Sequence, residues 1–135
     1  DLSKRWKAPQ LTAEWVGGNS VAEPSSGLET KILQVSRSDG DISVASNILL
    51  DFDLGPNVKN WSSLTGYSEG FHDVLILDHS VTFQPGEATA LFELPIVAGS
   101  HSESDEWLDV TVIPEYSGLY TSVPDSALRL TIVDA

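Results

Sequence analysis

Residues 80–96 read SVTFQPGEATALFELPI, and this stretch decides the fold class more than any other part of the chain. In its second half, F-E-L-P-I, apolar side chains alternate with other residues, which is the two-residue period of a strand with one face against a core. Pro85-Gly86 suits the two central positions of a type II turn, because proline presets φ and glycine accepts a positive φ. Pro95 cannot donate a hydrogen bond to a neighbouring strand, so we expect its strand at a sheet edge or bulged there.

The same alternation recurs along the chain. Clear repeats lie at residues 48–54, 108–112 and 128–132, and weaker strand candidates lie at residues 11–16, 29–36, 74–77 and 80–83. No stretch of about twelve or more residues has the spacing of an amphipathic helix. Seven or eight short strands, spaced roughly 8–12 residues apart, predict an all-β domain built as a two-sheet β-sandwich of antiparallel strands.

Two connections between these strands carry signals of their own. Ser38-Asp39-Gly40-Asp41 lies between two strand candidates, and Asp-Gly tolerates the positive φ of a tight hairpin turn. Residues 55–70 form a long polar segment, and loops of this length are often functional. Trp61, Tyr67 and Phe71 are therefore candidate contacts for a glycan or protein ligand. The favoured interpretation of Trp61 is that it folds back as the small core of its own loop.

Composition and charge limit the partners of the chain. Its 135 residues carry 7 Lys+Arg and 20 Asp+Glu, a net charge of −13, which disfavours nucleic acid and anionic membranes and favours multivalent cations. No apolar run is long enough for membrane insertion, and the absence of cysteine excludes disulfides and thiolate metal sites. The length fits a single domain, residues 10–135, after an N-terminal tail or interdomain linker at residues 1–9. The absence of methionine favours a segment of a longer chain.

Four motifs resemble those of the Calx-beta domain family, in the family's order. Ser20-Val21-Ala22-Glu23 is similar to the early V-x-E motif, and residues 81–87, VTFQPGE, are similar to V-x-F-x-P-G-[DE]. Residues 103–110, ESDEWLDV, resemble E-x-x-E-x-F-x-V with leucine in place of the aromatic residue, and residues 130–134, LTIVD, resemble the closing V-T-I-x-D. The likeness covers about nine-tenths of the chain. It implies the immunoglobulin-like β-sandwich known from sodium–calcium exchangers, integrin β4 and bacterial surface proteins.

The resemblance also implies a calcium site, because calcium-binding members hold the ion in acidic loops at one end of the sandwich. The matching positions are Glu23, Asp73, Glu103, Glu106 and Asp134. Ca²⁺ takes about 6–8 oxygen ligands, so five converging carboxylates would supply most of them. The family's acidic runs are replaced here by Ala98-Gly99-Ser100 and shortened to Asp134-Ala135. The resemblance therefore implies one weak calcium site, in the millimolar range of extracellular modules, rather than a cluster of ions.

Other chemistries have weaker support. His72, His79 and His101 lie in the acidic half of the chain, but His72 and His79 would face opposite sides of one continuous strand, which disfavours a transition-metal site. No nucleophile motif and no phosphate-binding loop is present, so we do not expect an enzyme. Lys31 and Lys59 leave open a Lys–Asn isopeptide cross-link, and a Thr–Gln ester is the other cross-link known from cysteine-free surface sandwiches of bacteria.

These observations favour a non-catalytic module of a larger secreted or cell-surface protein. Its expected role is that of an adhesive or structural spacer between neighbouring modules of the same chain, with one weak calcium site. The main alternative is a ligand-binding module that uses residues 55–70 to contact a glycan or a surface protein. An intracellular calcium sensor, as in the exchangers, is disfavoured by the missing acidic runs.

Overall fold

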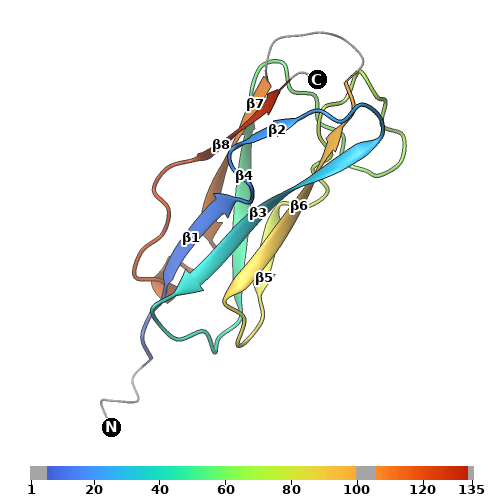
Figure 1. Cartoon of the computed structure of the whole chain (residues 1–135). Coiled ribbons are helices and arrows are strands. Elements are labelled where there is room, and N and C mark those ends of the chain that lie inside the picture. The colour runs from blue at the N-terminus through green and yellow to red at the C-terminus, as the bar shows by residue number, and fades with distance from the viewer. Residues whose placement is uncertain (1–5, 100–105, 134–135) are drawn as a thin grey trace.

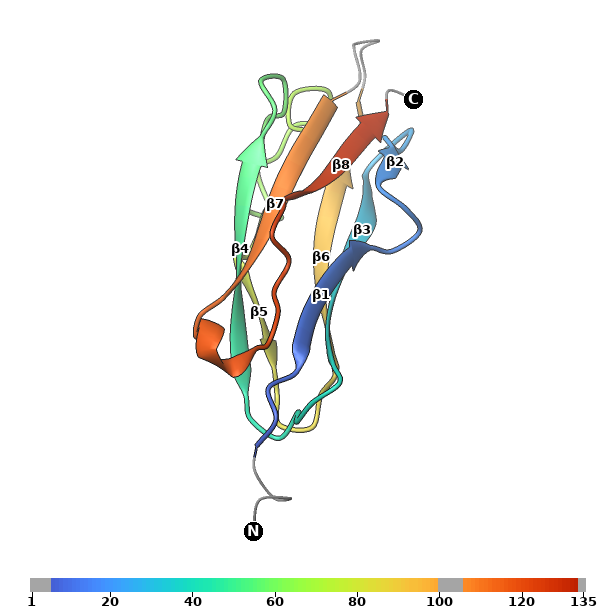
Figure 2. The ribbon, with the colours of Figure 1, turned by 90° about the vertical axis from the view of Figure 1, so that its left-hand side faces the viewer.

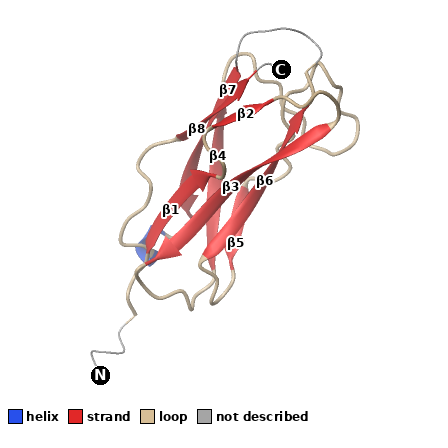
Figure 3. Ribbon diagram, in the orientation of Figure 1, coloured by secondary structure: helices blue, strands red, loops and turns tan. Residues whose placement is uncertain are grey.

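The computed structural model describes residues 6–99 and 106–133, which form two layers of strands (Figure 1, Figure 2). The strands are β1 (Gln10–Trp15), β2 (Ser20–Ala22), β3 (Leu28–Ser38), β4 (Ser46–Leu54), β5 (Ser80–Phe83), β6 (Thr89–Val97), β7 (Glu106–Pro114) and β8 (Leu128–Val133). One short 3-10 helix, η2 (Ser117–Leu119), interrupts the connection before β8 (Figure 3). The predicted all-β sandwich is confirmed. The described residues include no helix long and apolar enough to cross a membrane.

The strands are shared unequally between the two sheets. One sheet has the order β1-β3-β6, and the other has the order β2-β8-β7-β4-β5. All neighbours are antiparallel except β2 and β8, which run parallel, so the prediction of antiparallel strands throughout is wrong at this edge. The reason lies between β1 and β2, where Gly17 and Gly18 take positive φ angles of 83° and 108°. These conformations suit glycine and let the chain cross to the second sheet without reversing its direction.

The core lies between the sheets and is built from every second residue of the strands. Leu33 of β3, Leu94 of β6 and Val110 of β7 are fully buried, and they come from both layers. Other fully buried apolar side chains in the strands are Val35, Ile48, Phe83, Ile96, Leu108, Leu130 and Ile132. Burying one large apolar side chain contributes about 1.5–3 kcal/mol. The apolar side chains at alternate positions of the strands thus pack against one another and hold the two sheets together.

Pro95 lies in β6, an edge strand of the three-stranded sheet, as predicted. The C-terminal half of this edge is covered by the connection that leads to β5. Leu75 N donates to Pro95 O at 3.0 Å, and Val97 N donates to Asp73 O at 2.9 Å. The nitrogen and oxygen of one strand residue point to the same edge. Since the oxygen of Pro95 points away from β3, the missing N–H of this proline costs no hydrogen bond between β6 and β3.

The strand predicted at residues 74–77 does not form. Val74 makes only isolated bridges, one of them to Ile96. Val74, Leu75 and Ile76 are buried in succession, because this segment crosses from one sheet to the other instead of lying along one surface. A two-residue period cannot describe such a crossing.

The two predicted turns have different outcomes. Gly86 has a φ of 86°, as the Pro-Gly prediction requires. Asp39 has a φ of 60°, but the predicted hairpin is wrong, because β3 and β4 belong to different sheets. Gly40 instead allows Pro9 to pack against this connection, since a Cβ at position 40 would lie 2.6 Å from Pro9 Cα.

Arg37 is buried where β3 ends, at the pole of the sandwich near these turns. Its guanidinium donates hydrogen bonds to four main-chain oxygens, those of Ile42, Val44, Gln84 and Glu87, at 2.6–3.0 Å. The same group stands 4.7 Å from the centre of the Phe83 ring. One side chain thereby joins the connection between β3 and β4 to the connection between β5 and β6.

Candidate metal centre

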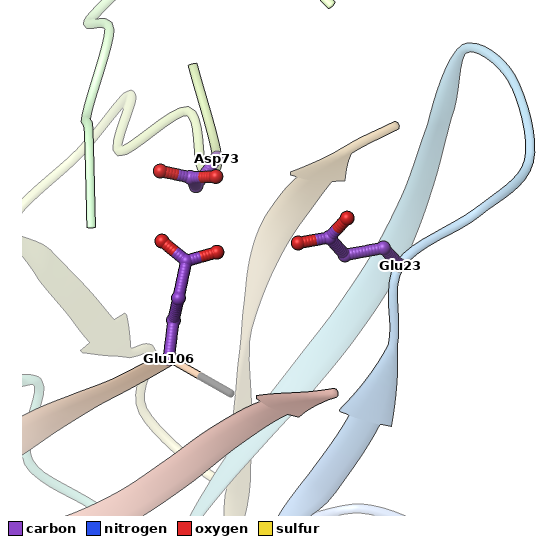
Figure 4. Close-up of side chains that lie close together, drawn as sticks. All are labelled: Glu23, Asp73 and Glu106. Carbon is purple, nitrogen blue, oxygen red and sulfur yellow. The ribbon is translucent and has the colours of Figure 1, made fainter. Parts of the chain in front are cut away.

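Three buried carboxylates from separate segments meet at the other pole of the sandwich (Figure 4). Glu23 follows β2, Asp73 lies in the connection that covers β6, and Glu106 begins β7. One carboxylate oxygen of each lies within 4.8 Å of the corresponding atoms of the other two. Their exposed fractions are 4%, 7% and 2%. Among the described residues, this is the one group of three acidic or histidine side chains close enough to share an ion.

Main-chain hydrogen bonds fix the backbone at each of the three residues from which the carboxylate side chains extend. Glu23 N donates to Val133 O of β8 at 3.0 Å, and Asp73 N donates to Lys59 O at 2.7 Å. Lys59 N in turn donates to Asp73 Oδ2 at 2.7 Å. Glu106 opens β7, which pairs with both β4 and β8. The group therefore joins the five-stranded sheet, the cover of the three-stranded sheet and the long loop.

Gly99, which lies just after β6, makes room for Glu23. A Cβ at position 99 would overlap the Glu23 carboxylate, so any larger residue would push that carboxylate aside. In the sequence, residues 98–100 differ from the family only by lacking its acidic run. The steric role of Gly99 has no signal in the sequence and follows from the structure.

The electrostatics of the group depend mainly on burial. Burial raises the pKa of Asp73 above its ordinary value of 3.8, because removal from water disfavours the charged form. The main-chain hydrogen bond from Lys59, the side-chain hydrogen bond with Glu106 and the positive charge of Lys59 act in the opposite direction and lower this pKa. Two carboxyl groups share a hydrogen bond only when one of them carries a proton. A cation that binds here would displace that proton.

The donor atoms suit a hard cation. The three side chains offer carboxylate oxygens, and Ca²⁺ prefers about 6–8 oxygen ligands in flexible geometry. Three carboxylates supply about three to six of them, which leaves places for main-chain oxygens or water. A cavity of about 230 Å³ opens beside Asp73, lined also by Asn57, Lys59, Gly70 and Phe71. This cavity gives the buried group a route to solvent.

The five acidic residues named from the sequence are only partly described. The structure brings together Glu23, Asp73 and Glu106. Glu103 and Asp134 lie outside the described residues, so their contribution stays a prediction. The family resemblance did not indicate that the three carboxylates are buried.

The aromatic residues of the long loop divide into two kinds. Trp61 is 39% exposed; its Nε1 donates to Thr65 O at 2.7 Å, and its ring lies 5.0 Å from that of His72. It therefore packs largely on its own loop. Tyr67 is half-buried, whereas Phe71 is 61% exposed at the mouth of the cavity beside Asp73. A ligand-contact role of these residues stays a prediction.

The histidines have other contacts. His72 is buried and accepts a hydrogen bond at Nδ1 from Ser68 N at 2.8 Å. His79 packs edge-on against Phe52, with the ring centres 6.0 Å apart. Within residues 6–99 and 106–133, neither of them joins a group of three metal-ligating side chains. His101 lies outside this part of the chain.

Solved structures share this fold. The apo-form Calx CBD1 domain aligns with a TM-score of 0.65 at 17% sequence identity and covers 96% of this chain and 99% of that one. CBD12 from CALX1.2 aligns at 0.59 and 17%, and the calcium binding domain CBD12 of CALX1.1 at 0.57 and 19%. This chain spans only 44% of the length of each CBD12 chain. The protein therefore has the fold of a Calx-beta domain, an immunoglobulin-like β-sandwich, as the motifs predicted. No family model and no curated protein matches the sequence.

Proposed function

We propose that this chain is a non-catalytic, calcium-binding module in which Glu23, Asp73 and Glu106 hold one ion. The observation that carries the proposal is the convergence of three buried carboxylates, drawn from segments far apart in the sequence, to within 4.8 Å. Burying like charges together is unfavourable unless a counter-charge offsets them. A divalent cation supplies that charge. The shared fold with a calcium binding domain, CBD12 of CALX1.1, supports the same conclusion.

The module would belong to a larger secreted or cell-surface protein, as an adhesive or structural spacer between neighbouring modules. Its net charge of −13 agrees with a module that binds a cation. Glu23 is hydrogen bonded to Val133, at the end of β8. A bound ion would therefore stiffen this end of the last strand, and with it a contact to a following module.

Calcium titration of the EDTA-treated protein tests the proposal. We expect isothermal calorimetry to show one site, with a dissociation constant near the millimolar range. At a tenfold excess of Ca²⁺ over that constant, binding stabilises the fold by about 1.4 kcal/mol and raises Tm by a few degrees. The variant Glu106→Gln should lose both effects, whereas the exposed control Glu14→Gln should keep them. A wild-type melting curve unchanged by Ca²⁺ would contradict the proposal.

The exposed side of the long loop supports a second candidate function, contact with a glycan or a protein ligand. Leu64 and Phe71 are 59% and 61% exposed, and the rings of Trp61 and Phe71 both pack against His72. A glycan array probed with the wild type and with Phe71→Ala tests this role. Binding that Phe71→Ala removes would support it, and an array without any bound sugar would count against a glycan ligand.

A self-formed cross-link is a further alternative with a simple test. Lys31 is buried, and its Nζ donates to the main-chain oxygens of Val16 at 2.8 Å and Ser20 at 3.5 Å. These partners are not the side-chain amide that an isopeptide requires. An intact mass lower than that of the sequence by one ammonia or one water would establish a cross-link, and an unshifted mass would exclude it.

A further inference from the structure

The free edge of β6 is covered over only half of its length. The hydrogen bonds of Pro95 O and Val97 N to the connection before β5 cover the C-terminal half. Main-chain groups of every second residue in a strand point to the same edge, so those of Leu91 and Glu93 point the same way as those of Pro95 and Val97. No main-chain group of the described residues bonds to Leu91 or Glu93 on this side. Residues 89–93 thus present an open sheet edge.

A groove runs along this open half of the edge. It has a volume of about 290 Å³ and is lined by Leu77, Asp78, Ser80, Val81, Leu91, Phe92 and Glu93. It forms where the chain leaves the edge of β6 and crosses to β5 in the other sheet. Leu77 and Leu91 are 42% and 55% exposed. The groove thus places apolar side chains beside unpaired main-chain groups.

We propose that this edge binds an extended segment of a partner protein, in which basic and apolar residues alternate, as an added strand of the three-stranded sheet. An unpaired edge supplies the main-chain hydrogen bonds for strand addition, and neighbouring pockets select alternate side chains. Leu91 and Glu93 lie on the same, solvent-exposed face of the sheet, so Glu93 takes the basic side chains of the added strand. Its apolar side chains point to the opposite face, that of Phe92, and enter the groove beside Leu77. A second copy of this acidic module is a poor occupant, because its net charge of −13 opposes close approach.

Fluorescence anisotropy with a labelled peptide, Lys-Val-Lys-Val-Lys-Val, tests this site directly. Measurements in EDTA keep the result independent of the calcium proposal. We expect saturable binding of this peptide and none of the acidic counterpart Glu-Val-Glu-Val-Glu-Val. The basic peptide with an N-methyl group on every amide should bind at least about tenfold more weakly, because neither edge of it retains an N–H that can pair with β6. Equal binding of the N-methylated peptide, or no binding of the basic one, would overturn the proposal.

Three variants distinguish strand addition at the edge of β6 from general electrostatic attraction of the peptide. Leu91→Pro removes an outward N–H without touching the bonds to β3, and the same strand already accommodates Pro95. Glu93→Lys reverses a charge that lines the groove. Both should weaken binding by about tenfold or more, while Asp51→Lys, the same charge change on the exposed face of β4, should change it less than about twofold. Circular dichroism confirms that each variant is folded. Equal weakening by Glu93→Lys and Asp51→Lys would mean that the peptide binds by non-specific electrostatic attraction, and this result would overturn the proposal.

Discussion

Asp73 makes stability depend on pH in a direction opposite to that of an ion-paired surface carboxylate. Burial raises its pKa above 3.8 in the folded state, so the folded protein holds this proton more tightly than the unfolded chain does. The stabilisation that this group contributes is therefore fully present below about pH 3.8 and is lost as the pH rises through the raised pKa. We predict that, in EDTA, Tm of the wild type falls over this window relative to Tm of Asp73→Asn, as thermal denaturation at several pH values will show.

The same proton links calcium to pH. Because the ion binds the deprotonated carboxylates, the Ca²⁺-dependent rise in Tm is expected to be larger at pH 7 than at pH 5. Asp73→Asn is the control, since it retains an oxygen that accepts the hydrogen bond from Lys59 N but has no proton to exchange. A calcium effect of equal size at both pH values would contradict a proton on this group.

Arg37 is a cation whose role is structural. Four main-chain oxygens accept hydrogen bonds from its guanidinium, and the residue as a whole is only 4% exposed. Arg37→Met keeps the apolar stem but leaves these oxygens without donors, so we expect a loss of about 3 kcal/mol in the free energy of unfolding, measured by urea denaturation. The exposed Arg129→Met, which breaks an ion pair with Asp109 at 2.9 Å, should change stability far less. Similar losses in the two variants would contradict this assignment.

At the scale of elements, the site depends on how closely the end of β6 approaches the end of β2. Gly99→Ala would place a methyl group where the Glu23 carboxylate lies. The carboxylate is the far end of a flexible side chain, so we expect a stability change below about 1 kcal/mol without calcium but roughly tenfold weaker binding of Ca²⁺, measured by calorimetry. Gly118→Ala in η2 is the control, because a Cβ there meets no atom within 4 Å. Calcium affinity unchanged by Gly99→Ala would contradict the role of Glu23 as a ligand.

The elements also show how far sequence reasoning reaches. Alternation identified the long strands, because each has one face in the core, and Pro95 correctly indicated an edge. The predictions for residues 74–77 and for the Asp39-Gly40 turn are wrong for one shared reason. The Asp39-Gly40 turn connects the two sheets, and residues 74–77, although they lie between two strands of one sheet, bond to the edge of the other. The period of side chains along a strand contains no information about which sheet a segment contacts.

The site was predictable to a similar degree. The resemblance to the family named Glu23, Asp73 and Glu106 among five acidic residues expected at one end of the sandwich, and the structure brings these three together. Their burial and the space left by Gly99 depend on the packing of three segments that are distant in the sequence. Local patterns carry no measure of such packing, so these features required the structure.

At the scale of the molecule, the two poles of the sandwich bury charges of opposite sign, and they neutralise these charges in different ways. At one pole a buried cation, Arg37, is neutralised by main-chain oxygens that are permanent parts of the fold. At the other pole three buried carboxylates depend on a proton or a metal ion from solution. The first pole is therefore expected to be stable under all conditions in which the protein is folded. The second pole is expected to loosen whenever calcium is absent, since local opening relieves the repulsion among its carboxylates.

Hydrogen exchange followed by NMR distinguishes the two poles. The amide N–H groups of Glu23, Asp73 and Val97 bond across the segments that meet at the carboxylates, whereas the amide of Arg37 bonds to Ala88 O at the opposite pole. With Ca²⁺ at tenfold its dissociation constant, we predict about tenfold slower exchange for the first three, because the ion must leave before these segments separate. The Arg37 amide should slow less, since its local opening does not release the ion. Equal slowing at both poles would mean that calcium stabilises the fold only globally, and the ion would then not act as a local clamp between the two sheets.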